Sequence, residues 1–204
     1  MALDTYANLS TAIGTWEDRT FTTAETDEFI LLAEANANRK LASDFRRRTT
    51  ATINTDATGL GTLPTGFVGL TSLVRDVLGS VPLKQVSWDA LIERNPYETS
   101  ADATVFAIRG TSLQVAEITD DNFLAVFSGS VTALSGSNTT NWLLTLAPDY
   151  YLTYGQACAA AKFKSYQEAA ILRAAANDIL DEIVSQGNVA EYGSAEMTLA
   201  MVTP

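Results

Sequence analysis

The feature that most constrains the fold is a change of pattern at residues 135–151, which have the sequence SGSNTTNWLLTLAPDYY. Before this stretch the chain is rich in β-branched residues and turn signals, as strands are. After it, apolar residues recur every three or four positions, as on one face of a helix. Asn141 can bond to the backbone in a turn, Trp142 can fill a junction, and Pro148 fits the first turn of a helix. The stretch therefore predicts a junction between a β-rich middle and a helical C-terminal third.

The N-terminal 48 residues also have a helical period. Asp4 or Thr5 can cap a first helix that ends near residues 14–16, and Thr22 with Glu25 predicts a capping box for a second helix. The inner stripe of the second helix is expected to consist of Phe29, Ile30, Ala33, Ala37, Leu41 and Phe45.

A basic cluster follows this stripe and ends with Arg46, Arg47 and Arg48. One interpretation is a solvated helix end, where basic residues complement the helix dipole. The other is a contact with a neighbouring subunit or an anion.

Residues 49–136 carry strand signals separated by turn residues. Residues 49–55 are rich in threonine and β-branched side chains. Strands are expected at residues 67–74, 82–86, 104–108, 112–116, 123–127 and 131–134, and a short helix at 88–94. The best hairpin signal is Gly110 between two of these runs. We expect a small, mostly antiparallel unit of about five strands.

Two further helices are predicted after the junction, at residues 148–163 and 167–184, with a break near Lys164 and a stop at Gly187. Cys158, among alanines, is expected to be a small buried side chain. The tail at residues 188–204 lacks a sustained period, and its apolar residues suggest docking on a partner, against fraying or packing on its own core. These residues are Met197, Leu199, Met201 and Val202.

These patterns predict an α+β fold. The N- and C-terminal helices form a helical bundle, and a small, mostly antiparallel β domain is inserted between them. Within one domain of 204 residues we expect N-terminal helices at 1–48, the β insertion at 49–136, C-terminal helices at 137–187 and a tail at 188–204.

Composition limits the possible functions. With 24 acidic and 13 basic residues the net charge is -11, so the average surface repels nucleic acid and anionic membranes. The absence of histidine removes the commonest general base and zinc ligand. The acidic run at residues 120–122 is expected to be a solvated turn, because the rest of a calcium loop is missing. We therefore predict no catalytic, cofactor-binding or metal-binding residues.

The N-terminus lacks a basic region followed by an apolar core, and no run of about 18 apolar residues occurs later. We expect a protein that is made in the cytoplasm and is not inserted in a membrane.

Several segments together resemble the bacteriophage head-to-tail adaptor (connector) family. They are MALDTYANL at residues 1–9, FILLAEA at 29–35, LPTGF at 63–67, EYGS at 191–194 and, most specifically, NTTNWLLTLAPDYYLTYG at 138–155. They occur in family order over nearly the whole chain. Departures are a less aromatic strand at residues 124–128 and a threonine at Thr153.

The resemblance implies a virion structural protein without enzymatic activity. It implies a homo-oligomeric ring, usually of twelve subunits, under the portal protein at the capsid vertex or neck, with its other face toward tail or nozzle proteins. DNA would pass through such a ring without specific binding. The candidate residues for protein contacts are Arg46, Arg47, Arg48, Trp142, Tyr192, Met197, Leu199, Met201 and Val202.

The alternative is a tail-associated hydrolase of cell-wall glycan that works through two carboxylates. Glu17, Asp18 and Glu25 are the residues it would recruit. Such chemistry needs one carboxyl group to be kept protonated in an apolar pocket.

Overall fold

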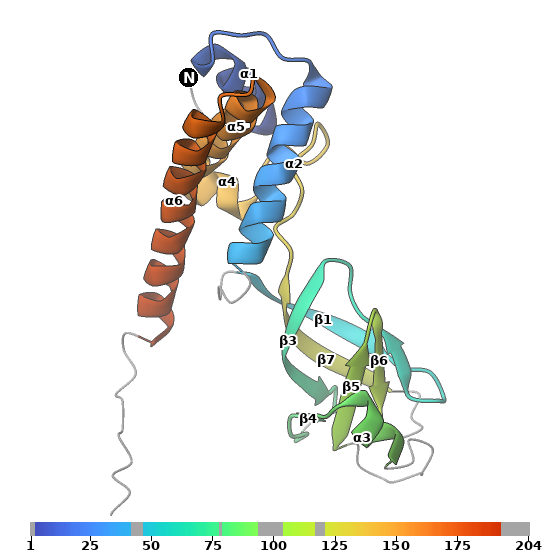
Figure 1. Ribbon diagram of the computed structural model, residues 1–204. Helices are drawn as coiled ribbons and strands as arrows, with labels where there is room; N and C mark the ends of the chain where they lie inside the picture. Colours follow the sequence, from blue (N-terminus) through green and yellow to red (C-terminus); the bar gives the residue numbers. More distant parts are fainter. Residues whose placement is uncertain (1–2, 42–46, 78, 94–103, 117–120, 193–204) are drawn as a thin grey trace, which may run out of the picture. The chain divides into compact units, whose positions relative to one another are not determined.

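The computed structural model describes the chain except for residues 1–2, 42–46, 78, 94–103, 117–120 and 193–204, and describes residues 188–192 by their backbone (Figure 1). The chain divides into two compact units. The helical unit contains residues 1–46 and 131–204, and the β unit contains residues 47–130. The fold is α+β with an inserted small β domain, as predicted.

The helical unit contains five of the helices in the described part of the chain. They are α1 (Tyr6–Trp16), α2 (Thr23–Lys40), α4 (Trp142–Leu146), α5 (Pro148–Lys162) and α6 (Tyr166–Tyr192). The predicted caps are confirmed: Thr5 accepts the backbone N–H of Asn8, and Thr22 forms a capping box with Glu25. Lys164 has a positive φ of 64°, which marks the predicted break between α5 and α6.

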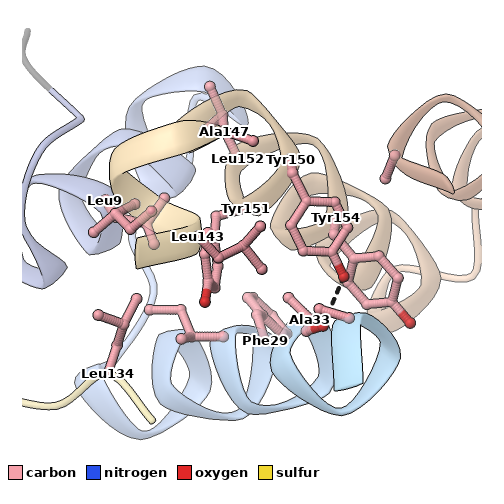
Figure 2. Packing of buried hydrophobic residues seen from close by; sticks show 14 of the residues in the cluster. Leu9, Phe29, Ala33, Leu134, Leu143, Ala147, Tyr150, Tyr151, Leu152 and Tyr154 are labelled. Carbon is pink, nitrogen blue, oxygen red and sulfur yellow. Dashed lines mark hydrogen bonds between the residues drawn. The ribbon is translucent and has the colours of Figure 1, made fainter. Parts of the chain in front are cut away.

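The core of the helical unit forms around α5, which packs against α1, α2, α4 and α6. Figure 2 shows Leu9, Phe29, Leu143 and Tyr151 pointing into the space between these helices. The predicted stripe of α2 is confirmed as buried from Phe29 to Leu41, while Phe45 lies outside the described residues. Cys158 is buried, as expected.

The β unit contains two sheets. The first has the order β1 (Arg48–Asn54), β7 (Asn122–Gly129), β3 (Phe67–Arg75), with β7 antiparallel to both neighbours. The second has the order β2 (Leu60–Thr62), β6 (Ser112–Val115), β5 (Val105–Arg109), β4 (Lys84–Gln85), and the last pair is parallel. The predicted hairpin is confirmed, with Arg109 opposite Ser112 and Gly110 at a φ of 61°. The short helix α3 (Trp88–Glu93) follows β4.

Inner faces of the two sheets form the core of the β unit. Ile53, Leu73 and Phe123 from the first sheet cluster with Leu113 and Phe106 from the second. Most of these strands coincide with runs of β-branched and apolar residues bounded by turn residues, the signal from which they were predicted.

Two predictions about secondary structure were wrong. Residues 131–134 do not form a strand, because Val131 and Leu134 are buried in the core of the helical unit at a spacing of three residues. Gly187 does not end the last helix, which continues to Tyr192. A glycine inside a helix costs only about 1 kcal/mol relative to alanine, and packing of buried neighbours such as Ile183 offsets that amount.

The strand count of about five was also too low. The described residues form seven strands, and β2 was not predicted because its three residues lie in a glycine-containing run that is typical of turns. The five-residue helix α4, inside the junction, was likewise not predicted.

Candidate functional site

Residues 131–134, here called the return segment, follow β7. They precede residues 138–155, the most specific segment of the resemblance, here called the family-like stretch. The return segment belongs to no helix or sheet. Two side chains of α2 bind its N–H groups: Asn38 Oδ1 accepts from Val131 at 2.7 Å, and Glu34 Oε1 accepts from Leu134 at 2.7 Å. These side chains therefore supply the hydrogen-bond acceptors that a neighbouring strand would supply in a sheet.

Two asparagines from the following loop bind the carbonyl groups of the return segment. Asn138 Nδ2 donates to the oxygen of Ala133 at 2.6 Å, and Asn141 Nδ2 donates to the oxygen of Thr132 at 2.8 Å. We call Glu34, Asn38, Asn138 and Asn141 the polar clasp. The polar clasp fixes the point where the chain re-enters the helical unit.

Asn141 has a second structural role. Its Oδ1 accepts the backbone N–H of Leu144 at 2.7 Å and so caps α4, and its Nδ2 also donates to the Tyr151 hydroxyl at 2.9 Å. With 8% of its surface exposed, Asn141 is one of few buried polar residues in the described chain. One side chain thus joins the return segment, α4 and α5.

The neighbouring tyrosines of α5 reach two different elements. The Tyr150 hydroxyl donates to the carbonyl oxygen of Ala33 in α2 at 2.6 Å, the bond drawn in Figure 2. It also accepts from Asn36 Nδ2 at 3.3 Å. Burial raises the pKa of both Tyr150 and Tyr151, so both hydroxyls stay protonated and serve as hydrogen-bonding groups.

Glu34 is the electrostatically unusual member of the polar clasp. Only 4% of its surface is exposed, and desolvation raises its pKa to about 7 although hydrogen bonds from Leu134 and Tyr151 favour the charged form. The carboxyl group therefore titrates near neutral pH in the folded protein.

Sequence reasoning did not single out Glu34 or Asn38. A signal was present for Glu34, because it lies four residues after Ile30 and inside the apolar stripe of α2. A charged residue at such a position has to find buried hydrogen-bond partners. Asn38 carried no comparable signal, since it follows the stripe residue Ala37 on a helix that also contains Asn36.

A comparison with known protein families identifies the family to which the chain belongs. A model of the SU10 adaptor protein family matches residues 4–198, which include both units and the polar clasp. The chain belongs to the SU10 adaptor protein family. A search for curated proteins of similar sequence found no match.

Membership in the SU10 adaptor family confirms the resemblance to phage head-to-tail adaptors. SU10 adaptors are structural phage proteins, which makes this chain a virion component of a class that interacts with portal and tail proteins. In the described part of the chain, no helix is both long and apolar enough to cross a membrane.

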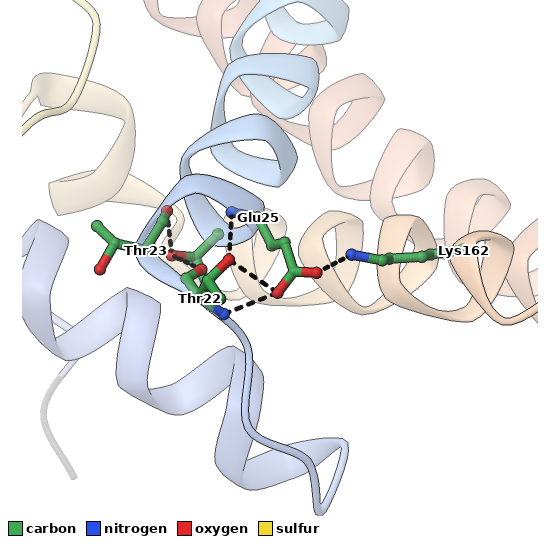
Figure 3. Close-up of polar contacts among 5 residues, drawn as sticks. Thr22, Thr23, Glu25 and Lys162 are labelled. Carbon is green, nitrogen blue, oxygen red and sulfur yellow. Dashed lines mark hydrogen bonds and ion pairs between the residues drawn. The ribbon is translucent and has the colours of Figure 1, made fainter.

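The carboxylates that a glycan hydrolase would use have structural partners in this SU10 adaptor. Figure 3 shows the Glu25 carboxylate bound to the backbone and hydroxyl of Thr22 and paired with Lys162. The bond from Lys162 is the main cause that lowers the pKa of Glu25 to about 2. A group that is ionised at all ordinary pH values does not serve as a general acid.

Glu17 differs from Glu25, because burial and the nearby charge of Glu168 raise its pKa. Asp18, next to it, lies in a turn with a φ of 50°. Glycan hydrolysis needs a protonated acid and a second carboxylate on opposite sides of one pocket. The contacts of Glu25 instead give it a structural role, as part of the capping box at the start of α2.

The structure places only some of the predicted contact residues. Arg47 is 3% exposed, and its Nε donates to the carbonyl oxygen of Gly129 at 2.7 Å within the β unit. Arg48 is exposed at the start of β1, and Trp142 is half-buried against the helical core. Tyr192 is the last residue of α6. The remaining candidates lie outside the described residues: Arg46, Met197, Leu199, Met201 and Val202.

The acidic turn at residues 120–122 lies partly outside the described residues. Asp121 forms an ion pair with Arg75, and its carbonyl oxygen accepts from the Thr55 backbone N–H at 2.9 Å. Both partners lie in the β unit, so Asp121 has a structural role there.

Proposed function

We propose that the protein forms a ring of twelve copies that binds the portal protein at the capsid vertex and presents its other face to tail or nozzle proteins. The observation that carries this proposal is the family match over residues 4–198. Because the match includes both units, it supports the complete adaptor arrangement and not merely a shared helical bundle.

DNA is proposed to pass through this ring without specific binding. Cationic groups on a channel wall would hold phosphates through release of counterions. A net charge of -11 on each copy supports passage without such retention.

The polar clasp supports this function by ordering the family-like stretch. It fixes the return segment, the start of α4 and the Tyr151 end of α5 relative to α2. A rigid junction presents the same surface in every copy, which a closed symmetric ring requires.

Protein contacts are proposed at the candidate residues other than Arg47. Burial and the bond to Gly129 assign Arg47 to the fold of the β unit. Exposed Arg48 and half-buried Trp142 are proposed to contact a neighbouring copy or the portal. The same is proposed for Arg46, Tyr192, Met197, Leu199, Met201 and Val202.

Mass photometry tests the proposal. The purified chain should be monomeric or weakly associated alone, and should form one discrete species of twelve adaptors per portal ring after mixing with the portal protein encoded by the same phage. The major capsid protein serves as a control partner. If the portal ring keeps its own mass at micromolar adaptor concentrations, the proposal is wrong.

A further inference from the structure

The strand β1 has an open edge. Along its whole length it pairs with β7, and among the described residues no other strand forms a ladder with its outer side, while β2 contacts its C-terminal end. A bridge between Thr55 and Gly61 lies just beyond its end. Every second residue of an edge strand turns its N–H and C=O groups away from the sheet. Residues 49–53 therefore offer a template for one more strand.

The other sheet edges of the β unit have features that prevent pairing. β3 has two shifts of register, and Leu83 donates to the oxygen of Leu73 at 2.8 Å on its outer side. β2 has three residues and β4 has two. Short strands and bulges are the means by which proteins block edge-to-edge association.

β1 lacks this protection. It has seven residues and neither proline nor charge after Arg48. Thr49, Thr50 and Thr52 are exposed, and threonine favours strand geometry. An unprotected edge of this length indicates a strand partner.

A suitable strand lies in the same sequence, beyond α6. Residues 197–203, MTLAMVT, alternate larger apolar side chains with small or β-branched ones and contain no charge and no proline. α6 ends at Tyr192, so twelve residues follow it up to residue 204. Fully extended, these residues span roughly 40 Å.

We propose that residues 197–203 of one copy add as a strand to the open edge of β1 in a neighbouring copy. This inference rests on the proposed ring. Each copy then carries one donor segment and one acceptor edge at different places, which is the requirement for a head-to-tail contact that closes into a ring.

Charge favours this form of contact. Each copy has a net charge of -11, so copies repel one another at long range. Neither residues 49–54 nor residues 197–203 contain an acidic residue. Main-chain hydrogen bonds between two uncharged strands form without bringing acidic side chains together.

Proline substitution in the donor segment gives the first test. The full-length variant L199P/M201P cannot complete a ladder of hydrogen bonds, and we expect the amount of ring formed with portal to fall at least tenfold. The matched control L199V/M201V keeps an apolar strand and should assemble like the wild type. Equal assembly of the proline variant and the control would overturn the inference. Failure of the wild type to assemble would instead contradict the proposed function.

Disulfide trapping identifies the occupant of the edge. One preparation carries T50C and another carries L199C, both in a Cys158→Ala background, and the two are mixed before portal is added and the rings are oxidised. We expect a linked dimer of one copy of each variant on a non-reducing gel. The control pairs L199C with T71C, an exposed position on β3, and should give at least tenfold less dimer.

Two results of the trapping experiment would refute the inference. The first is an absence of T50C to L199C dimers, and of T52C to L199C dimers, in rings that have formed. The second is a link within a single chain when one copy carries both cysteines, which would show that the segment pairs with its own β1.

Discussion

The Glu34 carboxylate oxygen Oε1 lies 2.7 Å from the backbone nitrogen of Leu134, one hundred positions along the chain. This bond joins α2 to the return segment at the entrance to the family-like stretch. Because Glu34 is buried and its pKa is raised to about 7, the strength of this junction depends on pH in the neutral range.

Replacing Glu34 by glutamine should make the protein more stable at pH 8. The ordinary pKa of this carboxyl group is 4.5, so the folded state holds the proton more tightly than the unfolded state does. The resulting stabilisation is complete below pH 4.5 and is lost as pH rises to 7, a loss on the order of 3 kcal/mol. Glu34→Gln removes this loss and keeps an acceptor for Leu134.

Chemical denaturation at pH 4.5 and pH 8 measures this effect as the difference between variant and wild type. The control Glu28→Gln removes an exposed carboxylate from the same helix and so separates the effect of a buried carboxyl group from that of losing one acidic residue of α2. If Glu34→Gln shows no dependence on pH, the raised pKa of Glu34 is refuted.

Replacing Asn141 by alanine should destabilise the protein by about 2–3 kcal/mol. The loss of the α4 cap contributes about 1 kcal/mol, and the Thr132 carbonyl oxygen and the buried Tyr151 hydroxyl each lose a donor. Urea unfolding measures the change. Thr140→Ala, at the exposed preceding residue, should stay within about 0.5 kcal/mol of the wild type, and similar values for both variants would argue against the role of Asn141.

Gly155 allows α1 and α5 to approach closely. A Cβ atom at this position would lie 2.7 Å from Ile13 Cδ1 and 3.0 Å from Cγ1, and Ile13 is fully buried. Gly155→Ala should therefore cost about 1–2 kcal/mol, although alanine is the better helix former. Thermal unfolding of the double variant with Ile13→Val should recover part of the loss, whereas additive losses would show that the two residues do not compete for space.

Replacing Trp142 by alanine separates a fold role from a contact role. Its half-buried ring packs against the helical core, so we expect a loss of about 2 kcal/mol. Trp16, which is 68% exposed, supplies the control, and Trp16→Ala should cost less than about 0.5 kcal/mol. An unchanged melting temperature for Trp142→Ala together with lost ring assembly would identify Trp142 as a contact residue alone.

Local signals in the sequence predicted much of the fold. The caps at Thr5 and Thr22, the stripe of α2 and the hairpin at Gly110 all depend on residues within a few positions of one another. Such features form from neighbouring residues, and a single sequence is sufficient to recognise them.

The polar clasp could not be predicted in this way, because Glu34 and Asn38 bind backbone groups about one hundred residues away. The β-branched and apolar residues of the return segment resemble a strand, and only the packing of Val131 and Leu134 shows that they belong to the helical core. Of the candidate contact residues, Arg47 illustrates the same limit, since nothing near it in the sequence indicates its bond to Gly129.

The polar clasp also has a consequence for the modularity of the chain. All four of its side chains and the return segment belong to the helical unit, so their mutual hydrogen bonds require no residue between positions 47 and 130. A variant in which a short glycine-serine linker replaces those residues should keep the helical content and the cooperative melting of the remaining bundle. The helical unit is thus expected to fold without the β unit, whereas assembly would still need the open edge of β1.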